Sequence, residues 1–185
     1  MGDDKYTSKI WKPKGGGHFT RQDGLYMRHL KTQLPKFKGG NVLEIGPGEG
    51  MFAYKLINEY KINKITFLDL EKNINKAYDF LRGKDVKIPI DRVFARNYKK
   101  LFEKRFNLIV ANVVITETPK EYREDLLNNM ISHCDYCMII GSLSNKQLNS
   151  DNYKEWLFDL FLKNFTKIRC EKTKYLNTYA LTGEK

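Results

Sequence analysis

Short apolar runs alternate with amphipathic segments along the chain from about residue 20 onward. Few polar residues interrupt these runs, which is typical of strands buried on both faces of a parallel sheet. We expect five such strands, at residues 42–45, 65–68, 93–95, 106–115 and 136–140. Two β-prone stretches close the chain, at about 165–173 and 175–182, and are expected to pair antiparallel.

The segments between the strands carry apolar residues at helical spacing. The first predicted helix begins after Thr20 and ends at Pro35. Later helices run through residues 52–60, 74–81 and 156–161. Gly83 is expected at the C′ position of the second of these, and Thr118 as N-cap, with Pro119 at N1, starts another. The pattern predicts an α/β fold with a doubly wound, mostly parallel seven-stranded sheet, Rossmann-like, and a C-terminal antiparallel strand pair.

Residues 20–185 are expected to form a single domain behind a flexible basic N-terminal arm, residues 1–19. The first forty residues hold nine Lys or Arg against three Asp, more than half of the net charge of +11. Such an arm could attract nucleic acid or an anionic small molecule, but we favour the simpler interpretation of a lysine-rich composition with a solvated tail. No apolar run approaches the roughly 18 residues that span a bilayer, so no membrane partner is expected.

The cysteines favour a reducing compartment. There are three of them, and an odd number in a chain without a secretory leader indicates free thiols and a cytoplasmic location. Cys134 and Cys137 form a C-x-x-C pair, but only His133 lies near enough in sequence to add a ligand. Cys137 also opens an apolar run, so we expect a buried strand and no metal site.

Residues 42–50, Val-Leu-Glu-Ile-Gly-Pro-Gly-Glu-Gly, are the most informative about function. A predicted strand ends in three alternate glycines and leads into a helix. Ligands of doubly wound sheets lie beyond the carboxyl ends of the strands, and glycine lets the backbone approach them. A phosphate-binding loop would need a following Lys-Ser/Thr pair, which is absent. The NAD fingerprint would need a third glycine where Met51 stands.

The pattern apolar-apolar-acid-apolar-G-x-G-x-G resembles motif I of the class I S-adenosylmethionine-dependent methyltransferases. The match is complete in this stretch. The resemblance implies a Rossmann-like methyltransferase fold with S-adenosylmethionine as the cofactor. It also implies a cofactor site containing the motif residues Glu44, Gly46, Pro47, Gly48 and Gly50.

Further residues fit the same resemblance. Asp69 ends the second predicted strand, nineteen residues after the last glycine of the motif. The family has an acid here that accepts hydrogen bonds from both ribose hydroxyls, followed by an apolar residue against the adenine, which implies these roles for Asp69 and Leu70. Asn97 falls where the family binds the adenine amino group. Residues 106–112 resemble the family's fourth strand, whose end lies beside the transferred methyl, which implies a place for Asn112 in the cofactor site.

The acceptor is less well defined by the sequence. Residues 111–117 lack the Asn/Asp-Pro-Pro-Tyr and Asn-Leu-Pro-Tyr motifs that amino-methyltransferases of bases carry, and no cysteine lies nearby for a pyrimidine mechanism. We therefore expect methyl transfer to a small molecule, such as a sugar or another metabolite. Three alternatives stay open: methylation of RNA or protein, a non-catalytic cofactor-binding module of the same fold, and a small NAD-binding domain.

Two residues are candidates for catalysis. The sulfonium methyl is already activated, so the protein must align the acceptor, exclude water and, for an oxygen acceptor, remove a proton. Glu117 lies near the end of the fourth strand, and His18 lies in a segment, residues 11–29, whose aromatic groups suit a lid. His29 and His133 are expected to be structural.

Overall fold

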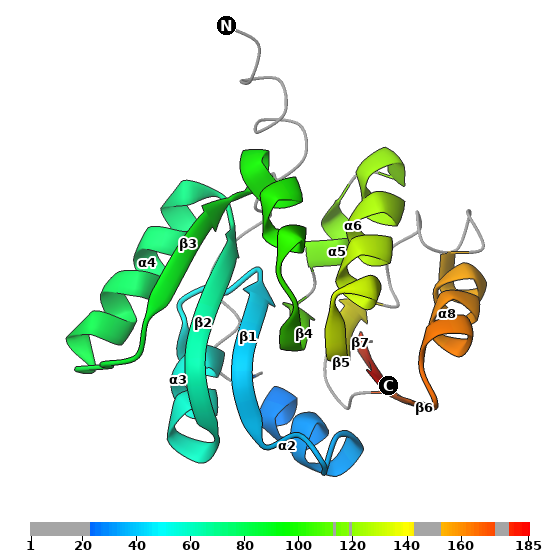
Figure 1. The fold of residues 1–185 in the computed structure, drawn as a ribbon, viewed down its shortest axis with the longest axis horizontal. Helices are drawn as coiled ribbons and strands as arrows, with labels where there is room; N and C mark the ends of the chain where they lie inside the picture. Colours follow the sequence, from blue (N-terminus) through cyan, green and yellow to red (C-terminus); the bar gives the residue numbers. More distant parts are fainter. Residues whose placement is uncertain (1–22, 113, 119, 143–152, 173–177) are drawn as a thin grey trace, which may run out of the picture.

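The computed structural model describes residues 23–112, 114–118, 120–142, 153–172 and 178–185. Seven strands form one sheet in the order β3-β2-β1-β4-β5-β7-β6 (Figure 1). The first five strands are parallel, and β7 runs antiparallel between β5 and β6. The strands are β1 (Gly39–Ile45), β2 (Lys61–Asp69), β3 (Ile90–Phe94), β4 (Phe106–Asn112), β5 (Cys134–Ser142), β6 (Lys167–Lys172) and β7 (Thr178–Glu184).

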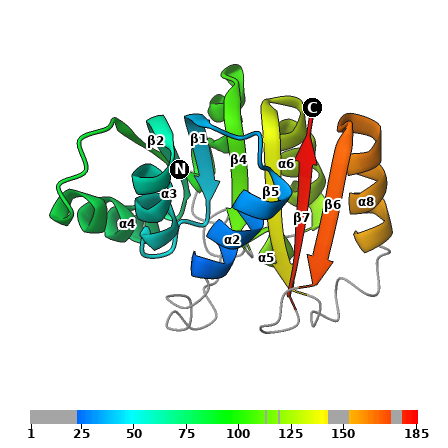
Figure 2. The same cartoon turned by 90° about the horizontal axis from the view of Figure 1, so that it is seen from below.

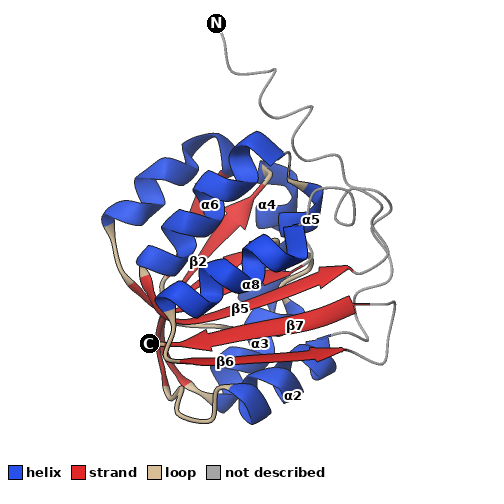
Figure 3. Cartoon of the chain, turned by 90° about the vertical axis from the view of Figure 1, so that its right-hand side faces the viewer, coloured by secondary structure: helices blue, strands red, loops and turns tan. Residues whose placement is uncertain are grey.

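Helices cover both faces of the sheet (Figure 2). On one face lie α2 (Asp23–Gln33), α3 (Met51–Glu59) and α4 (Glu71–Gly83). On the other lie the 3₁₀ helix η1 (Ala95–Glu103), α5 (Val114–Glu117), α6 (Lys120–Ser132) and α8 (Tyr153–Asn164). Figure 3 shows α6 and α8 stacked along the β5-β7-β6 half of the sheet. This architecture confirms the predicted α/β class, the seven strands and the terminal antiparallel pair.

Successive strand residues feed the two hydrophobic cores. Leu43 and Ile45 pack toward η1, α5 and α6, whereas Val42 packs toward α2 and α3. This alternation follows from the two-residue period of a strand, and burial of both faces explains why the strands read as unbroken apolar runs. Cys134 and Cys137 are buried in β5 as free thiols, and burial raises the pKa of Cys137.

The predicted fourth strand is too long. The run 106–115 was expected to be wholly extended, but β4 ends at Asn112 and Val114–Glu117 form a short helix. A Cβ on Gly46 would come within 2.1 Å of Val114 Cγ2, so this side chain packs against the loop after β1. Thr118 donates its hydroxyl to the Val114 carbonyl at 2.9 Å. Thr118 therefore closes α5 with its hydroxyl; α6 is described from Lys120, and the predicted N1 residue Pro119 lies outside the described residues.

Two other boundaries also differ from expectation. Gly83 does not adopt a left-handed C′ conformation; it is the last residue of α4, and Asp85 takes the positive φ of 57°. Aspartate tolerates this region because its short side chain can bond locally. The third strand covers residues 90–94, and Ala95 already begins η1. The predicted start at Thr20 lies outside the described residues.

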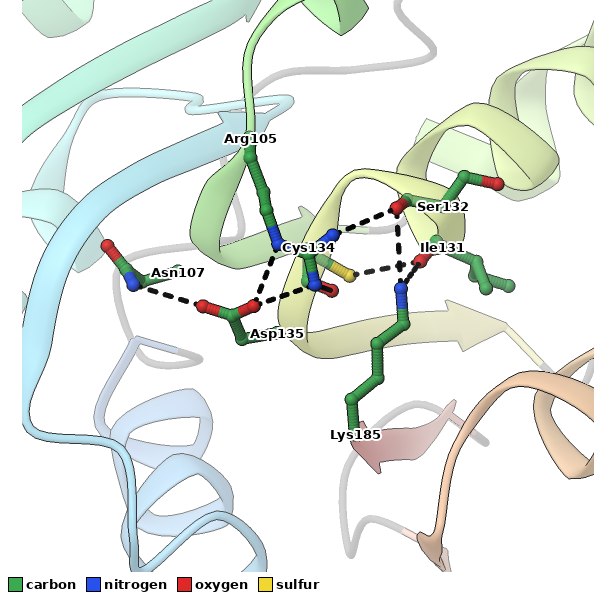
Figure 4. Close-up of polar contacts among 7 residues, drawn as sticks. All are labelled: Arg105, Asn107, Ile131, Ser132, Cys134, Asp135 and Lys185. Atoms are coloured by element: carbon green, nitrogen blue, oxygen red, sulfur yellow. Dashed lines mark hydrogen bonds and ion pairs between the residues drawn. The ribbon is translucent and has the colours of Figure 1, made fainter.

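The amino ends of β4 and β5 are joined by a polar network (Figure 4). The Asp135 carboxylate accepts hydrogen bonds from Arg105 Nε at 3.0 Å and Nη2 at 2.9 Å, and from Asn107 Nδ2 at 3.1 Å. Lys185, the last residue, donates to the Ile131 carbonyl at 2.6 Å. These contacts lie at the edge of the sheet opposite motif I.

No helix of the described residues is long and apolar enough to cross a membrane.

A buried polar contact fixes α2 on the sheet. His29 is buried, and its Nδ1 lies 3.2 Å from Gln33 Nε2 and 3.1 Å from Glu171 Oε2. Gln33 in turn accepts a hydrogen bond from Thr182 in β7 at 3.0 Å. Burial lowers the pKa of His29 more than Glu171 raises it. His133 contacts the Asn129 carbonyl through Nδ1 at 2.8 Å, at the end of α6.

The lowered pKa of His29 predicts a loss of stability in mild acid. The fold favours the neutral imidazole, so His29 contributes its full stabilisation above pH 6.5, the pKa of about 6.5 being that of the unfolded chain. This contribution is lost as the pH falls through the lower pKa that His29 has in the folded protein. We expect the melting temperature to fall less between pH 7.5 and 5.5 in His29→Gln than in the wild type. His133→Gln is the control and should keep the wild-type slope; equal slopes in all three proteins would contradict the prediction.

Candidate cofactor and acceptor site

The loop between β1 and α3 turns on three glycines in the left-handed region. Gly46, Gly48 and Gly50 have φ values of 75°, 55° and 81°. A Cβ on Gly50 would lie 2.9 Å from the Ala77 carbonyl oxygen of α4, so this glycine is required by packing, as is Gly46. A Cβ on Gly48 would meet no atom within 4 Å. Gly48 therefore faces open space at the carboxyl end of the central strand, where a ligand can lie against the backbone.

Asp69 ends β2 one strand away from this loop. It is buried, and its Oδ1 accepts hydrogen bonds from the Leu70 backbone N–H at 2.6 Å and from Asn73 Nδ2 at 3.1 Å. The contact with Asn73 was not predicted from the sequence, because it joins the end of β2 to the first turn of α4 and depends on how the chain turns at Leu70. These bonds hold the carboxylate at the strand end, beside the start of α4.

Glu44 and Asn112 form a buried pair between the two central strands. Asn112 Nδ2 donates to Glu44 Oε1 at 3.1 Å, and Glu44 is only 1% exposed. Asn112 Oδ1 is also buried, and no described residue donates a hydrogen bond to it. A buried amide oxygen without a partner is costly, so a donor from a bound ligand would stabilise it.

The remaining predicted residues fall on the same edge with different exposures. Pro47 is buried within the glycine loop, and Leu70 is half-buried ahead of α4. Asn97 is exposed on η1, just beyond the end of β3. Glu117 is the last residue of α5. His18 lies outside the described residues.

A second polar cluster, which no sequence motif predicted, lies at the carboxyl end of β5. Arg123 of α6 is buried, its Nε and Nη2 donate to the Thr118 carbonyl at 3.2 and 2.9 Å, and its Cζ lies 4.7 Å from the ring centroid of Tyr153. Tyr179 of β7 adjoins Tyr153, and burial raises the pKa of both phenols. The two hydroxyls interact with each other, and no other described residue offers either of them a hydrogen bond.

Together these groups line one edge of the sheet with distinct chemistry. The glycine loop and Asp69 offer backbone approach and a carboxylate, which suit a nucleoside. The pair Glu44–Asn112 lies in the middle, and the Arg123 cluster lies beyond β5. Among the described residues no group of His, Cys, Asp or Glu could hold a metal ion. A nucleoside-containing cofactor therefore fits the chemistry of this edge, and a second group of buried polar side chains lies toward β5.

The family model of the methyltransferase small domain matches residues 23–175. The chain belongs to this family. It is thus a methyltransferase that uses S-adenosylmethionine, as the glycine motif and Asp69 had indicated. When bound, the cofactor supplies an electrophilic methyl group. No curated protein matches the chain in sequence.

Solved methyltransferase structures share the fold at low sequence identity. The N-methyltransferase NodS from Bradyrhizobium japonicum WM9, crystallised with S-adenosyl-L-homocysteine, is 17% identical, with a TM-score of 0.65 over 91% of this chain and 88% of that one. The methyltransferase domain of bacterial CtHen1 is 14% identical, with a TM-score of 0.67 over 91% of this chain and 100% of that one.

A third structure is longer than this methyltransferase. An O-methyltransferase family protein from Burkholderia thailandensis is 9% identical, with a TM-score of 0.67 over 89% of this chain and 57% of that one. The chain therefore spans little more than half the length of that protein. At such identities these structures establish a shared fold, and the acceptor has to be inferred from this chain's own residues.

Replacing Asp69 should weaken cofactor binding. If Asp69 accepts charge-assisted hydrogen bonds from the ribose, as the motif I resemblance implies, Asp69→Ala should cost roughly 1.5–3 kcal/mol, or a 10- to 150-fold increase in Kd. Isothermal titration calorimetry with S-adenosylhomocysteine measures this change. The matched control is Asp91→Ala on neighbouring β3, where the carboxylate pairs with Lys64 and should not affect affinity. An unchanged Kd for Asp69→Ala would place the ribose elsewhere.

Replacing Gly48 should be more harmful to binding than to folding. A valine there projects into space that no protein atom occupies, and so into the path of the cofactor, in addition to the cost of a positive φ. We expect Gly48→Val to raise Kd more than Asp69→Ala does. Gly83→Val is the control, because a Cβ on Gly83 also meets no atom, yet its φ is not positive. Wild-type affinity in Gly48→Val would remove the loop from the cofactor site.

Proposed function

We propose that this methyltransferase transfers the methyl group to a small-molecule acceptor, such as a sugar or another metabolite, at the carboxyl ends of β4 and β5. The observation that carries the proposal is the buried cluster of Arg123, Tyr153 and Tyr179. Each side chain is at most 5% exposed. Buried hydrogen-bonding groups of this kind serve a ligand that is itself enclosed, as small-molecule sites are.

The cluster has unused hydrogen-bonding capacity. Burial raises the pKa values of Tyr153 and Tyr179, so both phenols stay protonated at neutral pH and can donate. Arg123 forms no ion pair with a carboxylate of the described residues. A polar acceptor with hydroxyl or anionic groups matches these donors.

The predicted cofactor residues are proposed to contact different parts of the cofactor along this edge of the sheet. Gly46, Pro47, Gly48 and Gly50 place the backbone against the cofactor, and Asp69 holds the ribose. Leu70 contacts the adenine, and Asn97 accepts a hydrogen bond from its amino group. Glu44 and Asn112 lie at the end of the central strands, where the donor and acceptor halves of the site meet.

The acceptor class can be tested directly. The chain is incubated with S-adenosylmethionine labelled in the methyl group and, separately, with a small-metabolite extract, RNA or unfolded protein. Label in the small-metabolite fraction is the expected result. Label only in RNA or protein would replace this proposal with the second candidate, which the net charge of +11 favours. Cofactor binding without transfer to any fraction would indicate a non-catalytic module.

Removing a phenol hydroxyl should affect the acceptor and spare the fold. Tyr153→Phe deletes a buried hydroxyl whose hydrogen-bond partner among the described residues is the Tyr179 hydroxyl, so stability should change little. The KM for the acceptor should rise, by about 5-fold or more for one lost hydrogen bond. Tyr98→Phe is the control: its hydroxyl donates to Asp125, so it should lower the melting temperature and leave KM unchanged.

An oxygen acceptor also needs a base, and Glu117 and His18 are the proposed candidates. Glu117→Gln or His18→Gln, whichever residue acts, should lower kcat by about 100-fold or more and remove the acid limb of the pH–rate profile. Affinity for S-adenosylhomocysteine should not change. Glu124→Gln, on an exposed position of α6, is the control. Two variants with wild-type profiles would show that neither residue is the base.

A further inference from the structure

Positive charge gathers at the β3 edge of the sheet, away from the acceptor side. Residues 82–105 contain nine Lys or Arg and three Asp or Glu, which gives them a net charge of +6 out of +11 for the chain. Two of the three acids already have cationic partners, since Asp85 pairs with Lys87 and Asp91 pairs with Lys64. The excess charge is therefore carried by side chains without a local counter-charge.

Six exposed basic residues make up this region, which we call the β3-edge surface. None of them forms an ion pair with a described residue. They come from the last turn of α4, from β3 and from η1 with its C-cap; α4 and η1 lie on opposite faces of the sheet, and each contacts the edge strand β3 (Figure 1). Its members are Arg82, Arg92, Arg96, Lys99, Lys100 and Lys104.

Aromatic rings lie among these cations. Arg92 Cζ is 4.5 Å and Arg82 Cζ is 5.2 Å from the ring centroid of Tyr78, and Arg96 Cζ is 5.5 Å from that of Phe94. Both rings are half-buried, so part of each stays accessible. Guanidinium planes and aromatic faces next to a basic surface are the groups on which unpaired bases stack.

A cavity of about 150 Å³ lies at the other end of the surface, between η1 and the sheet. Lys100 and Lys104 line it together with Arg105, Lys64 and Thr66. Arg105 is bound to Asp135 (Figure 4), and Lys64 is bound to Asp91. Lys100 of η1 and Lys104 at its C-cap thus supply the uncompensated charge in a space that can hold several water molecules and that we take as large enough for a phosphate group.

We propose that the β3-edge surface binds the phosphate backbone of single-stranded nucleic acid, with Lys100 and Lys104 on one phosphate. This activity goes beyond the proposed methyl transfer and uses a different part of the chain. An anionic membrane fits less well, because peripheral binding also needs apolar groups that insert. The exposed large hydrophobic residues of the described chain, Phe158 and Leu162, lie on α8 at the opposite edge.

The test is binding of a fluorescein-labelled single-stranded RNA 20-mer, followed by anisotropy from 50 to 200 mM salt. The wild type should bind at about 1–100 μM, with affinity that falls as salt rises. The triple variant Lys99→Glu, Lys100→Glu, Lys104→Glu should bind at least about 10-fold more weakly. The salt slope, which is the slope of log K against the logarithm of salt concentration, should become shallower by about 2. Its melting temperature should be unchanged, because these side chains are exposed and unpaired.

A matched control carries the same charge change elsewhere. The control is the triple variant Arg28→Glu, Lys38→Glu, Lys163→Glu, whose exposed positions lie on α2, just after α2 and on α8. It should leave the salt slope near the wild-type value. Equal weakening by both triple variants would overturn the proposal, since net charge alone would explain binding. So would binding to phosphatidylserine vesicles without binding to RNA.

The RNA-binding test and the acceptor test can fail independently of each other. Asp69→Ala should leave RNA affinity unchanged, because the β3-edge surface does not include the cofactor residues. Methyl transfer into the bound RNA would support the surface while replacing the small-molecule acceptor. Transfer to a small metabolite with no RNA binding would overturn the surface and leave the proposed function intact.

Discussion

The carboxyl edge of the sheet depends on the backbone reversal between β1 and α3. Three alternate glycines make it, and they are needed for different reasons. Gly46 makes room for Val114 of α5 on one side, and Gly50 makes room for Ala77 of α4 on the other. Gly48 makes room for no protein atom. Two positions of the motif are thus fixed by packing of the two helical layers, and only the middle one is left for a ligand.

Burial of polar groups is the second constraint at this edge. Glu44, Asp69 and Asn112 lie at the ends of adjacent strands, and the two acids are at most 4% exposed. Taking such groups out of water costs free energy unless hydrogen bonds replace the lost hydration. The bonds from Leu70, Asn73 and Asn112 offset part of that cost. A site that binds a polar cofactor accepts this arrangement because the ligand completes the hydrogen bonding.

The sequence predicts those features of the fold and the site that depend on interactions between residues close together in the chain. Strands buried on both faces and glycines at fixed spacing leave local signals, so the sheet and the motif I loop were predictable. The turn at Val114 was not, because a buried apolar helix reads like a strand, and the contact with Gly46 that bends the chain is tertiary. Asp85, and not Gly83, is the left-handed residue because α4 includes Gly83 and has Lys84 as its C-cap. Arg123, Tyr153 and Tyr179 meet only after folding.

The antiparallel strand explains how the last of these residues reaches the acceptor side. In the parallel part of the sheet, only the ends of strands lie at the carboxyl edge. Because β7 runs the other way, its beginning lies there, and Tyr179 pairs with Gly141 near the end of β5. A Cβ on Gly141 would lie 2.6 Å from the Tyr179 hydroxyl oxygen, so a glycine is required for the ring to lie across the strand. The reversed strand and this glycine together bring a phenol to the same edge of the sheet as the motif I loop and Asp69.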